Sequence, residues 1–68
     1  MEDEVVERLS LRAAIDALPE RERQVIFLRF YKNLTQDRAA KVLGVSQVQV
    51  SRIERRAVEH LRQALEEG

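Results

Sequence analysis

The sequence contains no cysteine, and this absence removes several kinds of chemistry at once. Without a thiol the chain forms no disulfide, no thiolate zinc site and no cysteine nucleophile. His60 is the single histidine, so a structural metal site is not expected, and neither is a cofactor. Function should therefore lie in binding.

Long apolar runs and glycine-rich loops are also missing. No stretch reaches the 18 or more apolar residues of a membrane span, and Met1 is followed by acidic residues rather than by the basic start of a secretory signal. Gly44 stands alone, so no phosphate-cradling loop is expected. The carboxylates are explained by helix dipoles and solubility, and His60 has no catalytic partner nearby in sequence, which favours a surface position. We expect a cytoplasmic protein that is not an enzyme and does not enter a membrane.

Apolar residues recur at helical spacing along most of the chain. Its 68 residues are enough for one small domain. Positions 5, 9, 11, 15 and 18 predict an amphipathic helix over residues 4–18, with an acidic start over 2–4 that suits the helix dipole. Pro19 ends that helix and suits the first turn of the next, which runs to about Lys32. This second helix should direct four apolar side chains inward, and Tyr31 should pack beside the last of them in the core with only its polar tip exposed. The four are Val25, Ile26, Leu28 and Phe30.

Residues 35–56, TQDRAAKVLGVSQVQVSRIERR, have the pattern of a helix-turn-helix. Thr35 and Ser46 are the expected N-caps of its two helices, and Gly44 stands where the chain turns sharply between them. Ala40 is small enough for the helices to cross closely. The apolar contacts between the helices should come from Leu43, Val45, Val50 and Ile53. The last helix continues from Gln47 to about residue 65.

Polar side chains crowd the outer face of this last helix, and all of them can bond to bases or phosphates: Gln47, Gln49, Arg52, Arg55 and Arg56. The alternative is a plain helical hairpin with a solvated basic face. The fold expected is all-α, a small four-helix domain over residues 1–68. Two helices lie in residues 1–34, and a helix-turn-helix with a long recognition helix lies in residues 35–66.

The charge of the chain is unevenly distributed although its net value is zero. Residues 24–56 carry seven basic and two acidic side chains, while the segments on either side are acidic. The central block is therefore about +5, and phosphates respond to charge within a Debye length of about 8–10 Å. This distribution indicates DNA binding by the centre of the chain, and weak binding by the chain alone.

Two segments together resemble region 4, the C-terminal domain of bacterial sigma-70 family RNA polymerase sigma factors: LPERERQVIFLRF at 18–30 and LTQDRAAKVLGVSQVQVSRIERRAVEHLR at 34–62. The resemblance extends from Leu11 to about Arg62. Its SQVQVSRIE stretch is most similar to the general-stress and sporulation subgroup. It implies a domain that contacts the promoter −35 element and binds the β flap of RNA polymerase, with an anti-sigma factor as a further partner. Since the promoter-melting and −10-reading regions are missing, the chain is expected to be a fragment of a longer factor.

The resemblance also assigns roles by position. Base contacts fall on Gln47, Val48, Gln49, Ser51 and Arg52. Phosphate contacts fall on Arg21, Arg29, Thr35, Gln36, Ser46, Arg55 and Arg56. The apolar excess of the second helix, together with the family, favours polymerase contacts on Val25, Ile26, Leu28 and Phe30, some of which would line a groove for an apolar helix of the flap. The alternative is that all four are buried in the core.

The recognition helix departs from the pattern of primary sigma factors, which have arginine, glutamate and glutamine at the positions of Gln47, Val48 and Arg52. Glutamine prefers adenine, valine contacts only a thymine methyl, and arginine is the usual reader of guanine. We therefore expect an A/T-rich −35 box that contains a guanine.

Two other functions remain open at this point. A four-helix response-regulator output domain also has a PxERE-like opening before its helix-turn-helix, and it would usually dimerise through its last helix. A protein-interaction module would bind an anti-sigma factor or polymerase and never DNA by itself.

Overall fold

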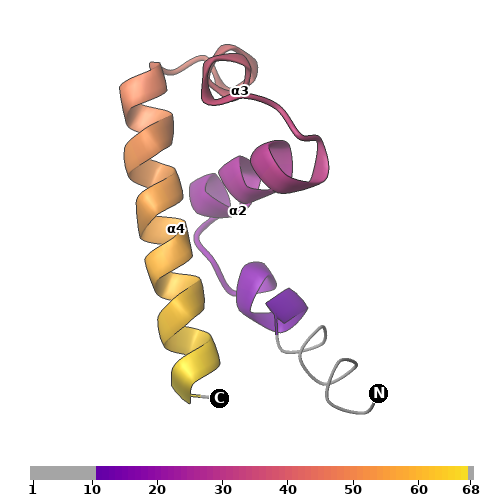
Figure 1. Cartoon of the computed structure of the whole chain (residues 1–68), viewed down its shortest axis with the longest axis vertical. Helices are drawn as coiled ribbons and strands as arrows, with labels where there is room; N and C mark the ends of the chain where they lie inside the picture. The colour runs from indigo at the N-terminus through magenta and orange to yellow at the C-terminus, as the bar shows by residue number, and fades with distance from the viewer. Residues whose placement is uncertain (1–10, 68) are drawn as a thin grey trace.

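The computed structural model describes residues 11–67, which form helices joined by short turns (Figure 1). The elements are a helical turn at 11–16, α2 (Glu20–Ile26), the π-helical turn η1 (Phe27–Tyr31), α3 (Gln36–Leu43) and α4 (Gln47–Glu67). Figure 1 shows α4 running the length of the fold, with α3 across one end and the first helical turn at the other. The expected all-α fold with a terminal helix-turn-helix and a long last helix is confirmed. No strand occurs in residues 11–67, and no helix there is long and apolar enough to cross a membrane.

The first helix was expected over residues 4–18. Its early part, including Val5 and Leu9 and the acidic start at 2–4, lies outside the described residues. The described part is helical only to Asp16, after which the chain turns and buries Leu18. Pro19 then takes the N-cap position of α2 with an extended ψ of 148°. The boundary predicted at this proline is confirmed, because the residue before a proline is pushed out of the α region.

Two apolar clusters form the core, and α2 contributes to both. The first consists of Val25, Ala39, Ala40 and Val50, with Leu28, Leu43, Val45 and Ile53 packed against it. The second consists of Leu18, Ile26 and Ala57, with Ile15 and Leu61 packed against it. Because residues 39 and 40 are alanines, α3 can pack closely against α4. The predicted apolar contacts of the helix-turn-helix all fall in the first cluster, which confirms them.

The end of the second helix differs from the expectation. Lys32 donates its backbone N–H to the Phe27 carbonyl at 3.1 Å, a hydrogen bond that spans five residues instead of four. The wider turn coincides with a change in burial: Ile26 is buried, while Phe30, which lines the same surface hollow as Ile26, stays open to solvent. Phe30 and Tyr31 are 57% and 67% exposed, so the prediction that they pack in the core was wrong.

Two side-chain pairs connect α4 to the preceding helices, and the sequence reasoning missed both. The His60 ring nitrogen Nδ1 lies 2.7 Å from Oε1 of Glu22, a buried carboxylate. Arg29 donates from Nε to Oε1 of Glu54 at 2.6 Å. His60 is exposed as expected, yet it has a partner 38 positions away in the sequence. Helix dipoles and solubility therefore do not account for all the carboxylates.

Candidate nucleic-acid interface

Both helices of the helix-turn-helix begin at a side-chain cap. The Thr35 hydroxyl oxygen accepts the Arg38 backbone N–H at 3.2 Å. The Ser46 hydroxyl oxygen accepts the Gln49 N–H at 3.2 Å, and Gln49 Oε1 accepts the Ser46 N–H at 3.1 Å. This reciprocal pair is a capping box. The two predicted N-caps are confirmed, and they fix the start of each helix.

The turn between the helices depends on Gly44. Its φ of 71° lies in the left-handed region, which costs little only for glycine. The Val45 N–H donates to the Ala40 carbonyl at 3.0 Å and closes the end of α3. The predicted position of the turn is confirmed.

The face of α4 that points away from the core is basic. At 100° per residue, Val48, Arg52 and Arg55 lie opposite the buried Val50 and Ala57, and all three are exposed. The basic face ends one turn further along the helix, at Glu59. This glutamate is paired with Arg62 at 3.0 Å.

A shallow depression of about 370 Å³ lies between this face and the start of α3. It is lined by Gln36, Gln47, Val48, Ser51, Arg52 and Arg55. Four of these are predicted base contacts and two are predicted phosphate contacts, from two different helices. The structure therefore brings together most of the polar set that the sequence singled out. Its members combine amide, hydroxyl and guanidinium groups, which are the groups that read base edges and bind phosphates.

Three more predicted phosphate contacts surround the depression. Thr35 and Ser46 are exposed at the helix starts, where their hydroxyl oxygens accept backbone N–H groups. The Thr35 hydroxyl proton remains able to donate, whereas the Ser46 hydroxyl donates to Oε1 of Gln49 at 3.5 Å. Arg56 is exposed beside the basic face of α4. Arg21 lies apart from them, exposed on α2 beside Val42 and Leu43 of α3.

Arg29 and Gln49 have other roles in this structure. Arg29 donates from Nη1 to the Leu34 carbonyl at 2.7 Å in addition to its bond with Glu54, and its side chain is only 27% exposed. The Arg29 guanidinium thus connects three parts of the fold: η1, the segment that precedes α3, and α4. The sequence had instead predicted that Arg29 contacts a phosphate. Gln49 uses its amide oxygen in the capping box, where the prediction had a base contact.

Comparison with known proteins identifies the fold family. The family model described as Sigma-70, region 4 matches residues 14–63. This chain belongs to the sigma-70 region 4 family.

The relatives fall in the sporulation and stress group that the sequence indicated. The chain is 44% identical over 64 residues to RNA polymerase sigma factor SigF of Mycobacterium tuberculosis, which covers 94% of this chain and 24% of the relative. It is 41% identical over 61 residues to the sigma-F factor of Bacillus subtilis, which covers 90% and 24%. It is 40% identical over 63 residues to the sigma-B factor of the same species, which covers 93% and 24%. The chain thus spans about a quarter of these relatives' length.

A solved structure agrees with the same family. The cocrystal structure of the flagellar sigma/anti-sigma complex, Sigma-28/FlgM, matches with a TM-score of 0.85 and 38% identity, over 98% of this chain and 30% of that one. The response-regulator alternative is not favoured by these matches.

The residues expected to bind polymerase are mostly inaccessible in this region 4 domain. Val25 and Ile26 are 0% and 3% exposed, because Val25 packs against α3 and α4 in the first core cluster and Ile26 packs against α4 and Leu18 in the second. Leu28 is half-buried against the first core cluster. Phe30 is exposed, and Ile26, although buried, lines the surface hollows described next. The expected contact is therefore wrong for Val25, which is fully buried.

An exposed apolar surface does lie beside them, lined partly by other residues. We call it the aromatic groove, and its apolar and aromatic lining residues are Leu11, Ile15, Ile26, Phe27, Phe30, Tyr31, Val58 and Leu61. It consists of two adjoining hollows of about 440 and 410 Å³ that share Ile15, Ile26 and Tyr31. A signal was present in the sequence: in FLRFY, three aromatic residues fall within five positions, more than one face of a short helix can bury.

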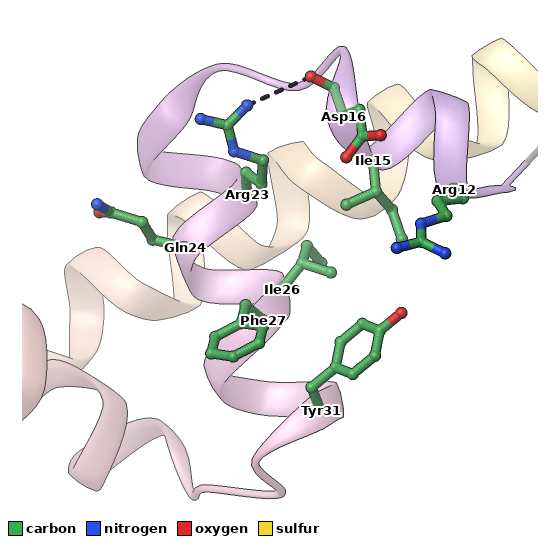
Figure 2. Close-up of a pocket in the computed structure, with 8 residues that line it drawn as sticks. All are labelled: Arg12, Ile15, Asp16, Arg23, Gln24, Ile26, Phe27 and Tyr31. Atoms are coloured by element: carbon green, nitrogen blue, oxygen red, sulfur yellow. Dashed lines mark hydrogen bonds between the residues drawn. The ribbon is translucent and has the colours of Figure 1, made fainter.

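Figure 2 shows the first of the two hollows, with Phe27 and Tyr31 projecting from the same turn. Their ring centroids are 5.7 Å apart with an interplanar angle of 26°. Across the hollow, Arg23 donates to the Asp16 backbone carbonyl at 3.3 Å and fixes the rim (Figure 2). The result is an apolar floor with a charged edge, a common form of protein-binding surface.

Proposed function

We propose that this domain recognises the promoter −35 element as part of a sigma factor in transcription initiation. The depression shared by α3 and α4 is the observation that carries the proposal. It gathers amide and guanidinium side chains on an exposed face at the start of α4, where a recognition helix can enter a major groove.

The proposed base contacts are Gln47, Val48, Ser51 and Arg52. The proposed phosphate contacts are Arg21, Thr35, Gln36, Ser46, Arg55 and Arg56. Three of the latter, Thr35, Gln36 and Ser46, stand at helix N-termini, where free backbone N–H groups and the helix dipole favour an anion. Glu59 then limits the interface, since a carboxylate on the same face repels phosphate.

RNA polymerase core is the second proposed partner, bound through the aromatic groove. An apolar helix of the flap would cover Phe27, Phe30 and Tyr31, which are otherwise exposed to water. An anti-sigma factor is a third proposed partner, since the similar sigma-28 was solved in complex with FlgM. The domain would act in the cytoplasm, by binding rather than by catalysis.

The DNA-binding proposal is tested by selecting duplexes from a random pool and titrating the chain with a selected and a scrambled duplex over a range of salt. We expect the selected duplex to bind at least about tenfold more tightly at equal salt. Equal affinity for both would contradict sequence recognition. Arg56→Ala should weaken both duplexes alike and lower the salt slope by about 1, because it removes one phosphate contact.

The polymerase proposal is tested with two charge-neutral changes of exposed apolar residues. Phe30→Asn lies in the aromatic groove, and Val42→Asn lies on α3 outside it; the two side chains are 57% and 62% exposed. The first should weaken binding to the β flap by about tenfold or more, while the second should leave it unchanged. If both variants bind the flap like the parent chain, the groove is not the polymerase surface.

A further inference from the structure

The first residues of α3 and α4 meet across the depression. Gln36 is the first residue of α3 and Gln47 the first residue of α4. Gln47 donates from Nε2 to Oε1 of Gln36 at 3.5 Å, at the long end of the hydrogen-bond range. No base or phosphate is needed to bring the two amides together.

The caps immediately before them hold both glutamines in place. Thr35 fixes the start of α3 through the Arg38 N–H, and Ser46 fixes the start of α4 through its capping box with Gln49. Each glutamine therefore projects from a defined point of the backbone. Only the side-chain torsion angles remain to be set. The last one, χ3, has a broad and nearly two-fold preference in glutamine, so the amide can take two opposite orientations.

The contact between the amides makes the two orientations of Gln47 unequal. A primary amide has one oxygen and two N–H groups, one on the same side as the oxygen and one pointing away from it. The oxygen and the nearer N–H form the edge that matches N6–H and N7 of adenine. The Gln36 oxygen accepts a hydrogen bond from Nε2 of Gln47, whereas a rotation of the Gln47 amide by half a turn would bring two oxygens together.

We propose that Gln36 orients the amide of Gln47 to read an adenine, which makes Gln36 a specificity-determining residue at a base pair that it does not touch. The idea rests on the proposed function, in which α4 lies in the major groove. Gln36 keeps its own NH₂ group free to donate to a phosphate at the start of α3. Gln36 would thus link a contact with the DNA backbone to the reading of a base by Gln47.

The test uses the full chain, three single variants and a panel of duplexes in which each position of the selected box is changed in turn. Gln47→Ala removes the reader. Gln36→Ala removes the positioning group, and Gln36→Glu keeps an acceptor for Gln47 but loses the donor. Since Gln47 is exposed and Gln36 is half-buried, circular dichroism should show all three variants folded.

We expect both alanine variants to reduce the same adenine preference, from roughly tenfold to about twofold, the range that one bidentate base contact supplies. The double alanine variant should lose no more preference than either single one. Gln36→Glu should keep the preference while weakening every duplex, because a carboxylate faces phosphate. Replacing that adenine by 7-deazaadenine, which lacks N7, should weaken the parent chain but not Gln47→Ala.

Two results would overturn the proposal. If Gln36→Ala weakens all duplexes equally and leaves the adenine preference intact, Gln36 is a phosphate contact only. If Gln36→Glu loses the preference as fully as Gln36→Ala, the acceptor for Gln47 is not what matters. Failure of the proposed function would look different, since the parent chain would then prefer no duplex at all.

Discussion

The two ends of α4 present opposite surfaces to solvent. Around its first turns, α3 and α4 bury their apolar side chains, and the exposed depression is lined mainly by amides and guanidinium groups. Around its second half the core is covered less completely, so that Phe27, Phe30 and Val58 are 47%, 57% and 47% exposed. We refer to these as the helix-turn-helix end and the aromatic end. The first suits a charged polymer and salt-dependent binding, and the second suits an apolar partner.

The difference can be tested most strongly with two identical changes on α4. Val50 is 0% exposed and Val58 is 47% exposed. Val50→Ala should lower the free energy of unfolding by about 2–3 kcal/mol, through lost burial and a residual cavity. Val58→Ala should lower it by about 0.5 kcal/mol or less, because little apolar area leaves the core. Urea denaturation measures both, and similar losses would show that the aromatic end is as tightly packed as the other.

A second comparison concerns arginines at the two ends of the same helix. Arg52→Ala should weaken binding to the selected duplex by about 1–3 kcal/mol and flatten discrimination at one position, where we expect a guanine. Arg62→Ala should leave DNA binding unchanged, because Arg62 lies beyond the basic face and pairs with Glu59. Titrations against the duplex panel decide this. A uniform loss on all duplexes would make Arg52 a phosphate contact instead.

The ion pair between Arg29 and Glu54 should stabilise the packing of η1 against α4, between the helix-turn-helix end and the aromatic end. Glu54→Gln is expected to cost about 1–2 kcal/mol of stability, since the pair is largely buried and its side chains are 27% and 18% exposed. Glu59→Gln is the matched control, and its exposed pair should contribute almost nothing. A double-variant cycle with Arg29→Gln isolates the coupling energy. A coupling near zero would mean that Arg29 acts through the Leu34 carbonyl alone.

The smallest effect is expected at the turn of the helix-turn-helix end. A Cβ atom at Gly44 would meet nothing within 4 Å, so Gly44→Ala is penalised only by the left-handed backbone. We expect a loss of about 1 kcal/mol, and a smaller loss for Gly44→Asn, because asparagine tolerates this conformation better. Thermal unfolding of the two variants provides the ranking. A larger loss for asparagine would point to steric contact.

The helix-turn-helix end was predictable from sequence because its determinants are local. A cap lies within three residues of the N–H it binds, and the turn requires one glycine, so Thr35, Gly44 and Ser46 were assigned correctly. The aromatic end was not. Its π-helical turn is announced by no periodic pattern, the aromatic content of FLRFY was read as core, and its side-chain pairs join residues 25 and 38 positions apart. For the same reason Arg29 was read as a phosphate contact, since its partner is distant in sequence.

The length of α4 has a consequence for how the two proposed partners assemble. Its 21 residues extend about 31 Å, whereas the major groove is about 12 Å wide. Only the start of the helix can lie in the groove, and Val58 stands about 15 Å further along the axis than Val48. The helix therefore acts as a rigid spacer that keeps the aromatic groove clear of the duplex. DNA and polymerase could then be held at the same time, and binding of either would raise the effective concentration of the other without any change of shape.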